Sequence, residues 1–152
     1  MEIVIQPVAF VKNSRKDISD DFWGIITSEI QLVESIPSDA FNGIEEFSHL
    51  EVIFHFDQTE KAKTVWKGRP RGNKDWPEVG IFAQRKKNRP NAIGLTIVEL
   101  LRRRGNTITV RYLDAIDGTP VIDIKPVMKE FLPLSSIRQP QWTSELMKKY
   151  WL

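Results

Sequence analysis

Short segments in which apolar and polar residues alternate recur along this chain, and turn-forming residues separate them. A period of two is typical of β-strands that bury one face. Two such segments flank Arg104-Gly105-Asn106, a sequence typical of a hairpin turn in which Gly or Asn takes a positive φ. The pattern predicts about seven strands, at residues 2–11, 23–33, 50–56, 80–84, 93–101, 107–113 and 120–127.

Helix-forming patterns are sparse. Residues 143–150 are expected to form one short C-terminal helix, with Thr143 as its cap and Leu146 and Met147 on its apolar face. Several short strands at regular spacing predict an all-β fold, either an antiparallel barrel or a sandwich. At 152 residues the chain is expected to form one domain, residues 1–152, with a sizeable core.

Positive charge is concentrated in one segment, residues 61–89. It contains ten basic and two acidic residues, whereas the whole chain has a net charge of only +2, so the rest of the chain is acidic. Clustered Lys and Arg attract phosphate groups, which indicates a polyanionic partner bound at one place. A solvated surface loop is the alternative interpretation. In either case we expect this segment to be a long loop at the mouth of the β-structure.

The composition excludes several kinds of site. Without cysteine, the chain has no disulfide framework, no thiolate metal site and no Cys nucleophile. Its two histidines, His49 and His55, are too few for a His-rich zinc site, so no metal is expected. No apolar run approaches the roughly 20 residues that span a bilayer, and residues 1–7 do not have the pattern of a secretory signal. We therefore expect a cytoplasmic protein.

Two places in the sequence are candidates for contacts with a nucleoside. Asp114 and Asp117 lie three residues apart on a predicted turn, where they could hold the vicinal hydroxyls of a ribose. The string Asp-Gly-Thr-Pro is also ordinary turn chemistry, which is the alternative. Trp23 precedes Gly24, and an aromatic ring beside a residue without a side chain can lie on an adenine face. Packing of Trp23 in the core explains this pair equally well.

Polar residues also follow two other predicted strands. Asp57-Gln58-Thr59 follows the predicted strand at residues 50–56. It either contacts a ligand or simply connects this strand to the next loop. Arg85 lies before Pro90, and this proline favours an extended Arg89. The planar fork of an arginine can bind two oxygens of a carboxylate or phosphate at once. A charged loop is the alternative for both arginines.

These strings, in this order, resemble the TsaA-like (TrmO) family over about residues 3–126. The resemblance is carried by Arg89-Pro90-Asn91-Ala92-Ile93-Gly94 and by the turn of residues 113–120, which continues into Val121-Ile122-Asp123-Ile124-Lys125-Pro126. Members of the family methylate N6 of threonylcarbamoyl-adenosine in tRNA with S-adenosylmethionine. The resemblance implies an antiparallel β-barrel, usually a homodimer, that works without a metal and off the membrane.

The resemblance also implies S-adenosyl-L-methionine as cofactor and tRNA as partner. It leaves the catalytic residue open, with Asp57 a candidate base and His49 a poorer one. When Trp23 and Gly24 are added to the positions that the resemblance implies, the candidate cofactor contacts are Trp23, Gly24, Asp57, Gln58, Arg85, Ile97, Asp114, Ala115, Ile116 and Asp117. The residues expected to grip the RNA backbone are Arg69, Arg71, Lys86, Lys87 and Arg89.

Three positions depart from the family pattern. Residues 15–24 replace a loop that typically reads PRQPGL, Asp57 replaces a His, and Ala92 replaces a Pro. The changed loop at residues 15–24 weakens the prediction of the substrate more than that of the cofactor. Two alternatives therefore stay open: a methyltransferase of the same fold with another small or anionic acceptor, and an RNA-binding barrel that has lost its cofactor.

Overall fold

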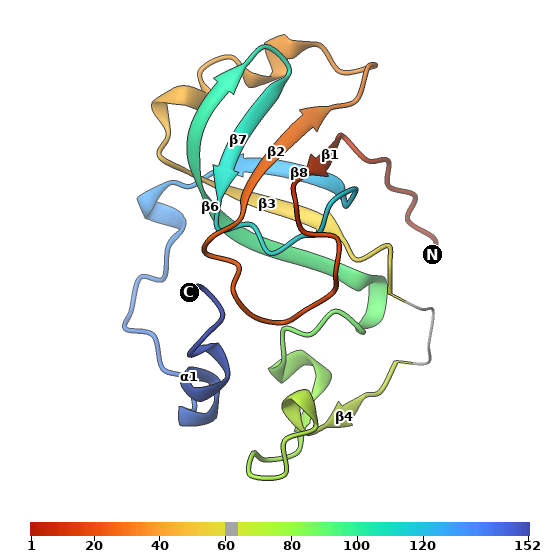
Figure 1. The fold of residues 1–152 in the computed structure, drawn as a ribbon, viewed down its shortest axis with the longest axis vertical. Coiled ribbons are helices and arrows are strands. Elements are labelled where there is room, and N and C mark those ends of the chain that lie inside the picture. The colour runs from red at the N-terminus through yellow and green to blue at the C-terminus, as the bar shows by residue number, and fades with distance from the viewer. Residues whose placement is uncertain (60–63) are drawn as a thin grey trace.

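The computed structural model describes residues 1–59 and 64–152, and Lys61 and Lys63 of the basic segment lie outside this part (Figure 1). Six antiparallel strands form a closed barrel in the order β1-β2-β7-β6-β3-β8, which confirms the predicted all-β barrel. The barrel closes where Ala9 pairs with Val121. The strands are β1 (Ala9–Lys12), β2 (Thr27–Leu32), β3 (His49–His55), β6 (Ile93–Arg104), β7 (Thr107–Arg111) and β8 (Pro120–Pro126).

Alternation along the strands builds the core. In β3 every second residue is buried, namely Leu50, Val52 and Phe54, and the residues between them are more exposed. The other strands add their own inward faces, so that one apolar cluster fills the barrel. The β6–β7 hairpin turns at Gly105 with a φ of +59°, as its sequence predicted.

Close packing inside the barrel requires a glycine on β6. Gly94 lies opposite Phe54, and a Cβ on Gly94 would lie 2.5 Å from two atoms of the buried Phe54 ring. Gly94→Ala is expected to lower the free energy of unfolding by about 1–3 kcal/mol, because a packed aromatic ring would have to move. Thermal unfolding measures this. Gly68→Ala is the matched control, because nothing lies within 4 Å of its added Cβ, and an equal loss in both variants would contradict the packing argument.

The predicted strand at residues 80–84 is wrong. Gly80 ends β5 (Val79–Gly80), which pairs with β4 (Lys67–Gly68) in a separate two-stranded sheet, and a 3-10 turn follows at Ile81–Ala83. The alternation stops within the run, because Ile81 is buried but Phe82 and Ala83 are both exposed. The side chain of Gln84 donates to the carbonyls of Gly68 and Val79, which folds the run back onto its own segment.

Other predicted boundaries shift for local reasons. Residues 1–6 are exposed and not in a strand, so the first strand begins only at Ala9, after Pro7. Residues 23–26 form a turn, in which Ile26 N–H donates to the Trp23 carbonyl, so β2 starts later than expected. The helix α1 (Gln141–Met147) begins directly after Pro140. Thr143 is therefore not its cap, and its hydroxyl donates to the Pro140 carbonyl at 2.6 Å.

Three segments lie outside the barrel strands. In Figure 1, α1 and most of the insertion of residues 64–92 lie below the barrel, the 13–26 loop crosses its lower part, and the chain after β8 runs down beside it to α1. Asp21 of the loop accepts two hydrogen bonds from Arg71 of the insertion, at 3.0 and 3.2 Å. The indole N–H of Trp76 donates to Glu145 of α1 at 2.8 Å. The three segments are thus joined to one another as well as to the barrel.

Short 3-10 turns complete the described chain. They are Ser38–Phe41, Ile44–Glu46, Pro70–Gly72, Ile81–Ala83, Pro90–Ala92 and Lys129–Phe131. Within residues 1–59 and 64–152, no helix has the length and apolar character needed to traverse a bilayer.

Candidate functional site

The candidate site lies where the turn after β7 passes the middle of β6. Asp114 on this turn accepts hydrogen bonds from two side chains that are distant in sequence. The hydroxyl of Thr96, in β6, donates to its Oδ1 atom. The hydroxyl of Tyr150, beyond α1, donates to its Oδ2 atom at 2.5 Å. Both oxygens of this carboxylate are therefore held by donors of the protein.

The charge of Arg85 also acts on the Tyr150 phenol. Burial and the negative charge of Asp114 raise the pKa of the Tyr150 phenol far above its usual value, so the hydroxyl stays a donor at neutral pH. The guanidinium of Arg85 is close enough to oppose this rise in pKa. Arg85 also donates to the backbone carbonyl of Leu95 in β6. Asp114 thus contacts Tyr150 directly, whereas Arg85 acts on the same phenol through its charge and lies against β6 at Leu95.

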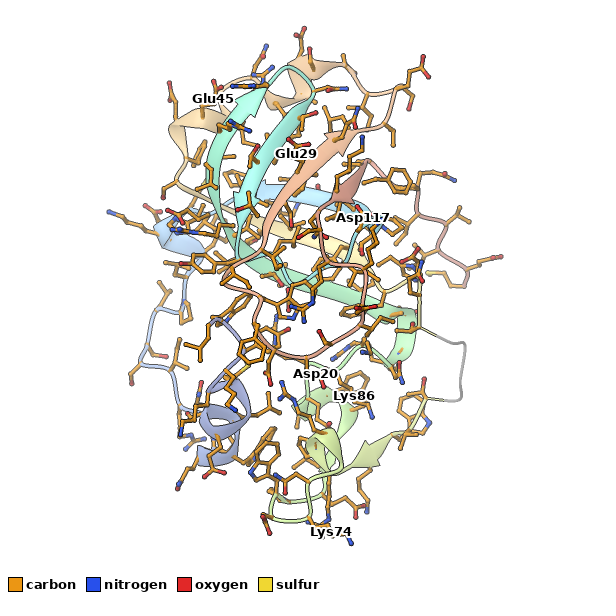
Figure 2. The ribbon with its side chains drawn as sticks, viewed as in Figure 1. Asp20, Glu29, Glu45, Lys74, Lys86 and Asp117 are labelled. Carbon is orange, nitrogen blue, oxygen red and sulfur yellow. The ribbon has the colours of Figure 1, made fainter. Side chains whose placement is uncertain are left out.

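The second turn carboxylate, Asp117, has other partners. Its Oδ1 accepts a hydrogen bond from the backbone N–H of Asn13 at 3.1 Å, and its Oδ2 lies 3.8 Å from Lys16 Nζ. Figure 2 labels Asp117 beside the barrel, and labels Asp20 and Lys86 lower in the view. Asp114 and Asp117 were predicted to act as a pair on one ribose, and the structure gives them separate surroundings.

The residues between the two carboxylates serve the turn itself. Ala115 is buried, and its carbonyl accepts a hydrogen bond from the Asn13 side-chain amide at 2.8 Å. The carbonyl of Ile116 accepts one from the Thr119 hydroxyl at 2.7 Å. Asn13 also donates to the hydroxyl of buried Ser28 at 2.9 Å. These bonds fix the backbone of the turn and so the position of its carboxylates.

Trp23 is buried, as its alternative interpretation predicted. Its side chain is 3% exposed, and the Arg15 guanidinium lies 4.2 Å from the centroid of its ring. Its indole N–H has no hydrogen-bond partner among the described residues. A buried donor without a partner costs about 1–3 kcal/mol. A polar group could reach this N–H only after the chain around it moves.

Gly24 allows a close approach, and the approaching group belongs to this chain. A Cβ on Gly24 would lie 2.0 Å from the backbone oxygen of Trp151. The backbone N–H groups of Phe22 and Trp23 donate to the carbonyls of Lys149 and Tyr150, at 3.0 and 2.8 Å. Residues 149–152 thus lie along the face where the sequence predicts an adenine ring.

The remaining cofactor candidates are exposed. Asp57 and Gln58 follow β3, and their side chains make no hydrogen bond within residues 1–59 and 64–152. Ile97 is 45% exposed on the outer face of β6, next to the inward-facing Thr96. His49 lies at the start of β3 and Asp57 beyond its end. A strand of seven residues spans about 20 Å, so these two candidate bases cannot serve the same acceptor.

The five basic residues expected to bind RNA divide into two groups. The three arginines are held by the protein: Arg69 by the carbonyls of Lys74 and Trp76, Arg89 by the Gln84 carbonyl, and Arg71 by the Asp21 carboxylate. Lys86 is exposed and Lys87 half-buried, and neither side chain has a hydrogen bond or ion pair in the described part of the chain. Only Arg71 is therefore paired with an opposite charge, and the two lysines are the members whose side chains have no partner at all in the described residues.

This arrangement suits a ligand that has both hydroxyl groups and a carboxylate. Asp114 can accept hydrogen bonds from hydroxyls, Arg85 can bind a carboxylate, and the Trp23 N–H is a further donor. Among residues 1–59 and 64–152, no three His, Cys, Asp or Glu side chains converge as metal ligands would.

Four side chains that shape this site were absent from the prediction. They are Asn13, Arg15, Thr96 and Tyr150. Nothing in the local sequence marks them, because each acts through a contact made only in the folded chain. Tyr150, for example, lies 36 positions from the carboxylate that it contacts.

Comparison with known proteins adds a second line of argument. Residues 20–131 match the tRNA-methyltransferase O N-terminal domain. A protein of Methanothermobacter thermautotrophicus named "Probable S-adenosyl-L-methionine-binding protein" is 41% identical over 133 residues, which cover 86% of this chain and 93% of that protein. The tRNA (adenine(37)-N6)-methyltransferase of Escherichia coli is 40% identical over 113 residues, which cover 68% of this chain and 47% of the enzyme.

A solved structure shares the fold. The crystal structure of TrmO from Pseudomonas aeruginosa superposes with a TM-score of 0.75 at 22% identity, covering 93% of this chain and 62% of that one. The chain thus spans less than two thirds of that structure and about half of the E. coli enzyme. Because the matched domain covers most of the chain, the protein belongs to the family defined by the N-terminal domain of tRNA-methyltransferase O.

Proposed function

We propose that this protein is an S-adenosylmethionine-dependent methyltransferase that methylates N6 of threonylcarbamoyl-adenosine in tRNA. The observation that carries the proposal is the family domain at residues 20–131, which contains every candidate cofactor residue. The hydrogen bond between Tyr150 and Asp114 and the effect of the Arg85 charge on the same phenol also support it, because the two residues come from separate segments.

The cofactor matches the groups of the site in chemistry. Asp114 would accept hydrogen bonds from ribose hydroxyls, and Arg85 would bind the carboxylate of the methionyl part. The buried Trp23 N–H would meet a polar atom of the ligand, and Ile97 would provide an apolar contact. The further proposed contacts are Gly24, Asp57, Gln58, Ala115, Ile116 and Asp117.

The residues of this chain contribute mainly by positioning. S-adenosylmethionine supplies a methyl group already activated by its sulfonium, so holding the acceptor nitrogen in line with that group accounts for most of the catalysis. The acceptor nitrogen is attached to a carbonyl and is a weak nucleophile, so a side chain that takes its proton would help. Asp57 is the candidate, since it is exposed and no side-chain hydrogen bond within the described residues occupies it. His49 is the poorer candidate.

The RNA would lie against the insertion. We propose that Lys86 and Lys87 contact phosphates directly, because the described chain does not neutralise them. Arg69 and Arg89, bonded only to backbone carbonyls, keep their charge and further N–H donors for phosphates, whereas Arg71 would have to leave the Asp21 carboxylate. Because tRNA is the proposed substrate, we also propose a cytoplasmic location.

A methyl-transfer assay tests the proposed function. The purified chain is incubated with S-adenosylmethionine labelled in its methyl group and with tRNA that carries or lacks threonylcarbamoyl-adenosine, and the nucleosides are analysed by mass spectrometry. Label on that nucleoside alone is the expected result. Label on a different acceptor would support the alternative methyltransferase, which the changed loop at residues 15–24 favours. If calorimetry shows no heat of S-adenosylmethionine binding, the result would support the other alternative, an RNA-binding barrel that has lost its cofactor.

We further propose a homodimer that uses the outer face of β6. Ile93 and Leu95 form an apolar pair there and are 38% and 44% exposed. Leu95→Glu would place a charge in the interface and is expected to give a monomer in analytical ultracentrifugation. Leu134→Glu is the control, since Leu134 is 92% exposed on another segment. A monomeric wild-type protein would refute the dimer.

A further inference from the structure

We propose that residues 149–152, called the latch here, close the candidate cofactor site, so that S-adenosylmethionine and the latch compete for Asp114 and for the face of Trp23 and Gly24. This inference rests on the proposed function and adds a means of regulating it. The matched family domain ends at residue 131, so the latch lies outside it.

Backbone and side-chain contacts hold the latch against the site. The carbonyls of Lys149 and Tyr150 accept hydrogen bonds from the N–H groups of Phe22 and Trp23, at 3.0 and 2.8 Å. Figure 1 shows the chain returning from α1 to the lower part of the barrel, where its C-terminal end is marked. The Trp151 ring packs edge-on against Tyr112, with centroids 5.9 Å apart.

The latch takes the groups that a nucleoside would need. The Tyr150 hydroxyl donates to Asp114 Oδ2, and Thr96 already donates to the other oxygen. A ribose hydroxyl that takes the position of the Tyr150 hydroxyl on Oδ2 must displace the latch, although each carboxylate oxygen can accept a second hydrogen bond. On Gly24, the Trp151 carbonyl lies so close that not even a methyl group fits between them. A ring cannot lie on this glycine until the latch moves.

The latched state also leaves one strong donor unused. The indole N–H of Trp23 is buried and has no partner in the described residues, although the latch runs directly beside this residue. A conformation with a ligand in place of the latch has a way to satisfy this donor. The unpaired Trp23 N–H therefore favours a latch that the ligand displaces over a latch that always covers the site.

The connection to the latch permits such movement. No residue of α1 is buried. The chain between β8 and α1 is largely exposed, with Phe131 at 81%, Leu134 at 92% and Ile137 at 74%. The polar bond from Trp76 to Glu145 and the packing of Trp76 near Trp142 join α1 to the insertion. A segment without buried residues opens at low free energy compared with the barrel.

Competition predicts that weakening the latch strengthens ligand binding. When a closed state must open first, the measured affinity falls by the fraction of molecules that are open. Tyr150→Phe keeps the ring and removes the hydroxyl that bonds to Asp114. The variant is expected to bind S-adenosylmethionine about tenfold more tightly, the factor that corresponds to one lost hydrogen bond to a charged group. Isothermal calorimetry on the full chain measures the change.

The other tyrosine provides a matched control. The described part of the chain offers no hydrogen-bond partner to the hydroxyl of Tyr112, so Tyr112→Phe should leave the affinity as in the wild type. Unchanged or weaker binding in Tyr150→Phe would overturn the latch while leaving the proposed function intact. Absence of S-adenosylmethionine binding in the wild type and in both variants would reject the proposed function, and the latch with it.

Trypsin reports on the latch itself. Saturating S-adenosylmethionine should speed cleavage after Lys149 several-fold, whereas a bound ligand ordinarily slows cleavage near its site. Tyr150→Phe should be cleaved faster even without ligand. Cleavage at the β6–β7 hairpin, after Arg104, is the internal standard. Slower or unchanged cleavage after Lys149 with ligand bound would show that the segment stays in place and would overturn the proposal.

Discussion

Asp114→Asn is expected to lower the affinity for S-adenosylmethionine by about tenfold or more, because one negatively charged acceptor is lost to the ribose hydroxyls. Asparagine keeps the shape of the side chain and one acceptor oxygen, so the hydrogen bond from Thr96 can persist. Calorimetry on the full chain measures the affinity, and the thermal midpoint shows whether the fold is retained.

The sign of this effect separates the two roles of Asp114. The carboxylate holds the latch through Tyr150 and is also proposed to hold the cofactor. Tyr150→Phe should therefore strengthen binding, whereas Asp114→Asn should weaken it. In the Asp114→Asn background, Tyr150→Phe should gain little, since contacting residues are not additive. Asp123→Asn, on a carboxylate that pairs with Lys125 at 2.8 Å, is the control. Equal losses for Asp114 and Asp123 would remove Asp114 from the site.

Changing Lys86 and Lys87 together to Gln is expected to weaken tRNA binding by about tenfold at 50 mM salt. The slope of log affinity against log salt concentration is expected to become less steep by about 1.5. Each lysine that neutralises a phosphate releases about 0.7–0.9 of a counterion, so two contacts give this change in slope. Both side chains lack an ionic partner in the described residues, which leaves their charge free to act. Filter binding at several salt concentrations measures the slope.

Single variants and one distant charge complete this test. Lys86→Gln and Lys87→Gln should each remove about half of the slope change. Arg104→Gln removes a charge from the exposed β6–β7 hairpin, away from the insertion in Figure 1, and should leave the slope unaltered. A double variant with the wild-type slope would show that the insertion does not face the RNA.

The sequence predicted the strands because their signals are local, and the family resemblance implied that they close into a barrel. Alternating apolar residues and the Arg104-Gly105-Asn106 turn act through neighbours in the chain, and six of the expected strands are present in the barrel. The run at residues 80–84 contains similar residues but has no sheet edge to join. The side-chain amide of Gln84 donates to two carbonyls of the insertion, and these contacts, rather than the local pattern, determine the structure of this run.

The strand pattern, the concentration of charge in one insertion and the strings that mark the family can all be recognised in the order of the residues alone. These are properties of neighbouring residues, which no distant contact alters. The pairing of Arg71 with Asp21, the different partners of Asp114 and Asp117, and the contact of Tyr150 with Asp114 became visible only in the folded chain. Each of these contacts joins groups that are far apart in the sequence and meet only after the barrel closes.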